Sequence, residues 1–169
     1  MGTDTLQHNA AAGLASNQHI IGWREWVALP ELGVPALKAK IDTGARTSAL
    51  HVTQLESFFE NGRHQVRFVL HPLRKRPALA INCQAEVVDE RLVSDSGGHR
   101  EKRLVIRTPL RLGGVEWSIE MTLTNREDML FRMLLGRTAM HRRLLVDPAR
   151  SYQCGRELRK AYRRSPLSK

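Results

Sequence analysis

The chain has 169 residues, of which 41% are hydrophobic and 26% are charged. This length suits one domain with a single hydrophobic core and is too short for two domains of ordinary size. No stretch approaches the roughly 20 consecutive apolar residues that a membrane-spanning helix needs, so we expect no association with a membrane. The composition is typical of a globular protein.

The N-terminal end and the cysteines indicate the compartment. Residues 1–19 carry no Lys or Arg and no continuous hydrophobic segment, unlike a secretory signal, so we expect a flexible leader and a cytoplasmic protein. The two cysteines, Cys83 and Cys154, form no Cys-x-x-Cys pair. We therefore expect two reduced thiols rather than a disulfide framework or a cysteine-built zinc site.

The formal net charge is +10, and half of it lies near the C-terminus. Residues 155–169 contain six basic residues and one acidic residue, a net charge of +5. A basic tail over 153–169 can aid solubility, or it can attract a polyanion such as nucleic acid, the ribosome or an acidic peptide. The sequence leaves both roles open.

From residue 20 onward, short runs rich in β-branched and aromatic residues alternate with Gly, Pro and Asn-Gly breaks, which indicates strands. The first strand is expected over Ile20–Leu29. The second, Pro35–Ile41, alternates apolar residues with lysines and is predicted to be half-buried. This second strand delivers Asp42 at its end.

Further strands are expected over residues 64–70, 79–93, 103–108, 115–124 and 133–135. Asn61-Gly62 predicts a tight hairpin turn, residues 94–98 a flexible hairpin tip, and Gly113-Gly114 another turn. Short helices are expected over 137–143 and 157–164. These elements predict an all-β fold, a small closed or nearly closed barrel with one or two short helices, over residues 20–152.

The segment Asp42-Thr43-Gly44-Ala45 has the clearest chemical meaning. Peptide hydrolysis without a metal needs a nucleophilic water and a proton for the leaving nitrogen, and two carboxyls that share one proton supply both. Asp42 is the candidate catalytic carboxylate. Gly44 leaves space and a backbone donor beside it, Ala45 stays small, and the Thr43 hydroxyl can anchor the loop. The alternative is a turn aspartate that caps a loop.

The order of motifs adds context. Asp-Thr-Gly-Ala, a Gly-rich hairpin about fifty residues later and Met133-Leu-Leu-Gly-Arg137 before a short helix together resemble the half-barrel of the retropepsins. Residues 21–30, 38–51 and 133–140 look like the bacterial retropepsin-like aspartic peptidase family often labelled ATP-dependent zinc protease. The resemblance implies a pepsin-type barrel, peptidase activity, and Gly136 and Arg137 packed beside the aspartate loop.

The same resemblance implies partners. Members of this family near ATP-grasp glutamate ligases imply a functional link to such a ligase and to glutamate tails added to proteins. An acidic substrate of that kind suits a basic chain. Asp95-Ser96-Gly97 repeats the motif letters, but its hairpin setting fits a flap better than a second catalytic loop.

The second carboxyl must therefore come from elsewhere. The retropepsin solution is a two-fold homodimer in which Asp42 meets its own copy. The alternatives are a monomer that uses another acid, or a protein that binds peptide without cutting it.

Other residues are candidates for substrate binding. Arg46 can bind a substrate carboxylate with both arms of its guanidinium or can be an ordinary surface residue, and Arg137 can do the same or form an internal salt bridge. The flap candidates can close over a peptide and exclude water; they are Ser94, Asp95, Ser96, Gly97, Gly98 and His99.

No cofactor is expected. The sequence has no Gly-x-x-x-x-Gly-Lys-Ser/Thr loop for ATP phosphates and no His-Glu-x-x-His for catalytic zinc. His51, at the end of the resembling segment, is the histidine to examine for a metal.

Three functions remain open: an aspartic peptidase acting on acidic protein substrates, a non-catalytic basic barrel that binds RNA, ribosome or acidic protein, and a metal-dependent hydrolase. RNA binding usually uses exposed aromatic residues, whereas Trp23, Trp26 and Trp117 lie on strand-like segments where we expect core packing.

Overall fold

The computed structural model describes residues 18–125 and 129–163. Most of the expected leader and the end of the expected basic tail lie outside these residues. The elements, in chain order, are β1 (His19–Ile21), β2 (Arg24–Leu29), η1 (Pro30–Leu32), β3 (Val34–Ile41), β4 (Ser48–His51), β5 (Thr53–Glu60), β6 (Arg63–Leu70), β7 (Ile81–Ser94), β8 (Arg100–Leu112), β9 (Val115–Thr124), β10 (Met133–Leu135), α1 (Arg137–Met140), β11 (Leu144–Val146) and η2 (Glu157–Tyr162).

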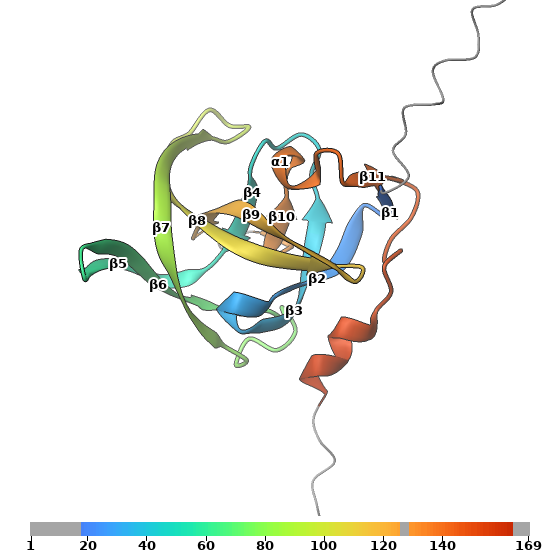
Figure 1. Ribbon diagram of the computed structural model, residues 1–169, viewed down its shortest axis with the longest axis horizontal. Helices are drawn as coiled ribbons and strands as arrows, with labels where there is room; N and C mark the ends of the chain where they lie inside the picture. The colour runs from blue at the N-terminus through green and yellow to red at the C-terminus, as the bar shows by residue number, and fades with distance from the viewer. Residues whose placement is uncertain (1–17, 126–128, 164–169) are drawn as a thin grey trace, which may run out of the picture.

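Nine of these strands form one sheet in the order β2-β3-β10-β4-β9-β8-β7-β6-β5, and an additional pairing of β2 with β8 closes it into a ring. Figure 1 shows this ring, with the β5–β6 hairpin projecting from it at the left. The α and η elements are short. The prediction of an all-β fold with one or two short helices is confirmed, and the helices near the C-terminus lie close to their expected positions.

The ring places β10 between two strands from the first third of the chain. β10 pairs in parallel with β3, so that Leu135 lies opposite Ile41, and antiparallel with β4. The chain leaving β10 therefore runs beside the loop that follows β3. This arrangement brings Gly136 and Arg137 to the segment that begins with Asp42.

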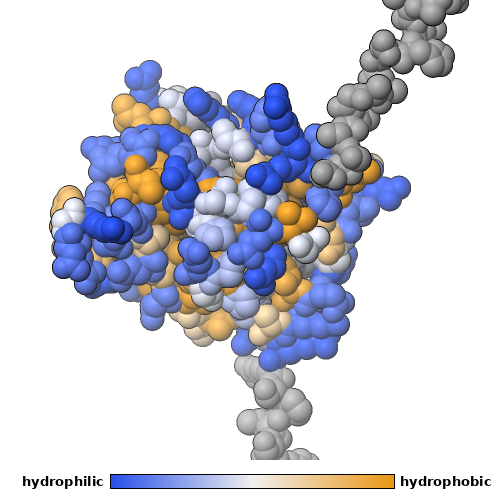
Figure 2. Space-filling model, in the orientation of Figure 1, coloured by the Kyte–Doolittle hydropathy of each residue, from blue (hydrophilic) through white to orange (hydrophobic). Residues whose placement is uncertain are grey.

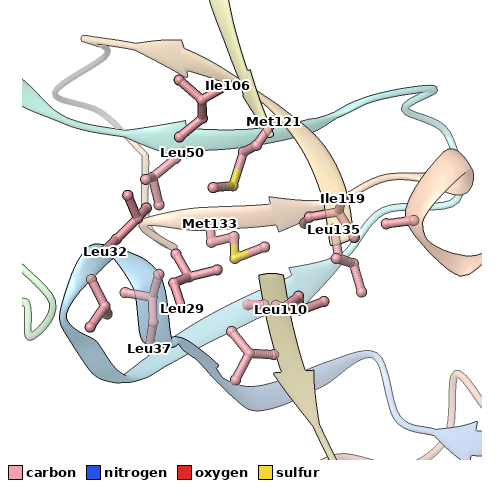
Figure 3. Close-up of a cluster of buried hydrophobic side chains, with 14 of the residues drawn as sticks. Leu29, Leu32, Leu37, Leu50, Ile106, Leu110, Ile119, Met121, Met133 and Leu135 are labelled. Atoms are coloured by element: carbon pink, nitrogen blue, oxygen red, sulfur yellow. The ribbon is translucent and has the colours of Figure 1, made fainter. Parts of the chain in front are cut away.

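Buried aliphatic side chains fill the ring. Figure 3 shows residues from β2, β3, β4, β8, β9 and β10 pointing toward one another, among them Leu37, Leu50, Met121 and Met133, all fully buried. On β6, Val66, Phe68 and Leu70 are buried, as the alternation predicts. The face seen in Figure 2 is mainly hydrophilic with small hydrophobic areas. No helix in the described part of the chain is long and apolar enough to cross a membrane.

The expected first strand is divided in two, which corrects that prediction. Gly22 and Trp23 lie between the parts. Gly22 lies against the chain near residue 150, where an added Cβ would come within 2.3 Å of the Arg150 carbonyl oxygen. Trp23 N–H donates to that same oxygen at 2.8 Å. β1 consequently pairs with β11 instead of joining the large sheet.

The segment after β11 packs on the ring before it leaves the described residues. Glu25 is fully buried, and its carboxylate accepts hydrogen bonds from the backbone of Gly22 at 2.9 Å and Gln153 at 2.7 Å. Near the end, the Tyr162 hydroxyl donates to the Ala36 carbonyl. These contacts attach residues 153–162 to β2 and β3.

Candidate functional site

Asp42 lies where β3 ends and is half-buried. Its N–H donates to the Leu135 carbonyl at 2.9 Å, and its Oδ1 accepts the Gly44 N–H at 3.0 Å. A Cβ on Gly44 would lie 3.2 Å from that oxygen, so a side chain there would crowd the carboxylate. The loop therefore holds one carboxylate oxygen with a backbone donor and leaves no side chain at position 44 beside it.

Gly136 and Ser48 form a buried contact that supports this loop. The Gly136 N–H donates to the buried Ser48 Oγ at 3.0 Å, and a Cβ on Gly136 would lie 2.6 Å from the Thr47 carbonyl carbon. Only glycine fits so close to another backbone. The close approach explains why a glycine follows the apolar run of β10.

The residues after Gly136 add three more contacts. Arg137 N–H donates to the Ala45 carbonyl at 2.8 Å, and Thr138 N–H donates to the Arg46 carbonyl at 3.0 Å. The Arg137 guanidinium donates through Nη1 to the Thr43 carbonyl at 2.9 Å. Arg137 thus supports the loop backbone. Its guanidinium binds the carbonyl group of Thr43 rather than the hydroxyl group that was expected to anchor the loop.

The predicted flap is the tip of the β7–β8 hairpin, which Figure 1 places at the same end of the ring as the loop after β3. The Asp95 Oδ1 accepts the N–H groups of Gly97 and His99, both at 2.9 Å. Asp95 therefore organises the turn. Ser96, Gly97, Gly98 and His99 are exposed.

A cavity of about 560 Å³ lies between the loop and the flap strand. The loop side contributes Gly44, Ala45 and Arg46, and the flap side contributes Ser94, the only one of the predicted flap residues to line it. The exposed Arg46 side chain has no hydrogen-bond or ion-pair partner among the described residues. The structure thus brings residues 44–46 of the loop and the first flap residue to one cavity, which neither Asp42, Thr43 nor the flap tip lines.

Most lining residues were not singled out as site residues from the sequence, among them Arg91, Leu92 and Glu120. The Glu120 carboxylate accepts from Arg91 at 2.6 Å and from Arg107 at 3.0 Å. The hydrogen bond from Arg91 is the main reason why the pKa of Glu120 is lowered, with Arg107 adding to it. Strand pairing that joins such distant residues leaves no local signal in the sequence.

Two further predictions concern metals and cysteines. Among the described residues, no group of three or more His, Cys, Asp or Glu side chains could hold a metal ion. His51 is buried on β4. Cys83 and Cys154 are unpaired thiols, and burial raises the pKa of each to about 11.

Comparison with known proteins places this geometry in a family. Residues 20–157 match the family described as the retropepsin-like aspartic endopeptidase RimB. The chain belongs to this RimB-like family. The matched region contains every element from β2 to β11, including the Asp42 loop, the hairpin and β10.

Curated relatives are longer proteins. A Shewanella pealeana protein named probable alpha-L-glutamate ligase is 46% identical over 142 residues, which are 84% of this chain and 31% of that protein. One of the same name from Desulfotalea psychrophila is 50% identical over 130 residues, 77% of this chain and 28% of that protein. This chain therefore spans less than a third of these relatives.

A solved structure has the same fold. The Legionella pneumophila protein Lpg0085, described as of unknown function, superposes with a TM-score of 0.68 at 29% identity, covering 82% of this chain and 99% of that one. The match covers nearly the whole of that solved chain.

Proposed function

We propose that the protein is an aspartic peptidase that hydrolyses peptide bonds in acidic protein segments, with Asp42 as the catalytic carboxylate. The observation that carries this proposal is the mounting of Asp42. The Gly44 N–H positions one of its oxygens, and the backbone of residues 136–138 holds its loop from β10. Membership of a family described as aspartic endopeptidases supports the reaction class.

The reaction needs a second carboxyl that can carry a proton. Glu120 is the carboxylate that lines the cavity within the described chain, and Arg91 keeps it ionised by lowering its pKa. It is therefore a poor proton donor. We propose that Asp42 of a second copy supplies the other carboxyl across a two-fold axis.

In this arrangement one carboxylate takes a proton from water while the water oxygen attacks the peptide carbonyl carbon. The protonated partner donates to the carbonyl oxygen, which gives a tetrahedral diol. A proton then passes to the leaving nitrogen as the C–N bond breaks, and the products are a carboxylic acid and an amine. The two aspartates end the cycle sharing one proton, as they began.

The proposed substrate is acidic because the cavity is basic. Three arginines and one glutamate line it, and Arg46 is available to bind a substrate carboxylate. Relatives named alpha-L-glutamate ligase support a substrate that carries added glutamates and a functional link to an ATP-grasp ligase. The location proposed for this protein is the cytoplasm.

The test compares the wild type with Asp42→Asn, which keeps an oxygen to accept the Gly44 N–H. Both are incubated with a glutamate-tailed protein and a mixed peptide library, with a chelator present throughout. We expect cleavage by the wild type alone, at a specific activity that rises with protein concentration until dimers saturate. Equal cleavage by both, or none by either, would reject Asp42 as the catalytic group and favour a basic binding protein.

A further inference from the structure

A second cavity lies outside the site described above and shares no lining residue with it. It encloses about 470 Å³ and lies between β2, β3, residues 72–76 and residues 130–132. We refer to it as the basic groove, because six of its lining residues are cations: Arg24, Lys38, Arg74, Lys75, Arg76 and Arg132.

The cations of the basic groove have no acidic partner among the described residues. No acidic side chain lines it among the described residues, and none of its six cations forms an ion pair in that part of the chain. Some arginines elsewhere share carboxylates: Arg91 and Arg107 contact Glu120, and Arg111 contacts Glu116 at 3.0 Å. The groove is distinguished by gathering six cations in one cavity with no carboxylate partner among the described residues.

Three of the six cations are arginines held in place by neutral groups. The Arg24 guanidinium lies 4.5 Å from the centre of the Trp23 ring and 4.9 Å from that of Tyr152. Arg76 donates to the Tyr162 carbonyl at 2.7 Å, and Arg132 donates to the His71 carbonyl at 3.1 Å. Such contacts orient the cations and leave their full charge for a ligand, which lowers the cost of binding an anion.

The groove also has an apolar side. Leu130 is 64% exposed, and its neighbours Phe131 and Leu73 are half-buried. An exposed leucine in a concave site gains free energy when a ligand side chain covers it. The ligand should therefore carry both negative charge and at least one apolar group.

Acidic peptide fits these features better than nucleic acid does. Base stacking needs accessible aromatic faces, but Trp26 is only 6% exposed and Lys38 Nζ lies 5.4 Å over its ring. Phe131 packs edge-on against Trp23, with ring centres 6.0 Å apart. The accessible apolar surface is instead that of Leu130, which suits an aliphatic side chain.

We propose that the basic groove binds an acidic segment of a partner protein, with carboxylates on its cations and one apolar side chain against Leu130. This binding site is additional to the proposed peptidase site and does not require it. It gives the protein a second point of attachment, separate from the bond that is cut.

The test measures binding of a fluorescein-labelled peptide of glutamates with one central leucine to the full chain carrying Asp42→Asn, by fluorescence anisotropy at low salt. The double change Arg74→Glu and Lys75→Glu should weaken binding roughly tenfold or more, and Leu130→Gln roughly threefold. The matched control, Arg63→Glu with Arg142→Glu, alters net charge equally at exposed positions outside both cavities. It should change affinity less than twofold.

Several results would overturn the proposal. They are equal weakening by the control pair, equal affinity for a peptide with glutamine in place of glutamate, loss of binding on Arg46→Glu but not on the groove changes, or groove-dependent preference for oligouridylate or phosphatidylglycerol vesicles. Circular dichroism confirms that each variant is folded. Binding is measured on an inactive variant, so it is independent of cleavage. Absence of peptide binding would reject the groove proposal and not the peptidase proposal, and absence of cleavage would reject the peptidase proposal and not the groove proposal.

Discussion

The Asp42 loop and the tip of the β7–β8 hairpin lie at the same end of the ring but are held in different ways. The loop receives hydrogen bonds from residues 136–138, about ninety positions later in the chain. The tip is organised by its own Asp95, which accepts from residues two and four positions ahead. The loop is held by hydrogen bonds from a distant segment next to the core, whereas the hydrogen bonds that Asp95 accepts at the tip lie within the turn.

This difference indicates which part can move. The loop cannot shift without displacing β10, which lies between β3 and β4 in the closed sheet. The tip can swing while β7 and β8 stay paired, because its hydrogen bonds move with it. For the proposed peptidase we therefore expect a rigid carboxylate and entry of substrate by movement of the hairpin.

The largest difference between the two regions is expected when one glycine in each is replaced by alanine. Gly136→Ala would place a Cβ 2.6 Å from the Thr47 backbone, so we expect a loss of about 3 kcal/mol of unfolding free energy and a melting temperature lower by about 6–12 °C. Gly98→Ala meets no atom within 4 Å, although its φ of +82° carries a cost of about 1 kcal/mol. Calorimetry measures both.

Equal losses for the two glycine variants would show that the tip is braced as firmly as the loop, and the contrast would then fail.

A serine pair tests the same contrast with a smaller expected effect. Ser48→Ala removes the acceptor of the Gly136 N–H in a buried site, which should cost about 2 kcal/mol. Ser94→Ala alters an exposed residue at the base of the tip and should change stability by less than about 0.5 kcal/mol. Urea denaturation of both variants decides the matter. If Ser48→Ala lowers stability no more than Ser94→Ala does, the hydrogen bond between Gly136 and Ser48 contributes nothing to stability.

The pH dependence of stability tests the cavity wall between the two regions. Arg91 holds the pKa of Glu120 below its ordinary value of 4.5 in the folded protein. The pair therefore stabilises the fold fully above pH 4.5, and this contribution is lost as the pH falls through the lowered pKa. Glu120→Gln should cost on the order of 1 kcal/mol at neutral pH.

Urea denaturation at a series of pH values measures the difference in unfolding free energy between wild type and Glu120→Gln. This difference should shrink as the pH is lowered below 4.5. A difference that stays constant into acid would show that the carboxylate is not what Arg91 stabilises.

The smallest effect on stability is expected at the tip. Asp95→Ala removes two hydrogen bonds from the turn and should lower the unfolding free energy by only about 0.5 kcal/mol. It should nevertheless speed tryptic cleavage after Arg100, because the exposed turn loses its local order. Unchanged cleavage together with a large loss of stability would mean that the tip belongs to the core.

Local patterns predicted much of the fold. The strand β9 has the predicted ends because Gly113-Gly114 precedes ten residues of strand-forming sequence, and β10 has them because its apolar run stops at Gly136. The strands β4 and β5 were not predicted. All four residues of β4 are buried although two are polar, and no residue of β5 is buried, so neither shows alternation.

Some residues of the candidate site could likewise be predicted from local sequence, and others could not. Asp42 and its small neighbours are consecutive, so a motif could reveal them. Ser48, Arg91 and Glu120 reach the site through strand pairing and an ion pair between β7 and β9, and no spacing rule connects them. The basic groove was foreseen only as an excess of positive charge, since its cations come from four separate segments.

We propose that two copies of Asp42 form one active site, and mixing wild type with an inactive variant tests this most directly. Wild type is held at a concentration where its specific activity has reached a plateau, and Asp42→Asn is added in increasing excess while peptide cleavage is followed. We expect activity to fall toward zero as mixed dimers with one aspartate replace wild-type dimers. Activity that stays constant under a large excess of the variant would contradict it.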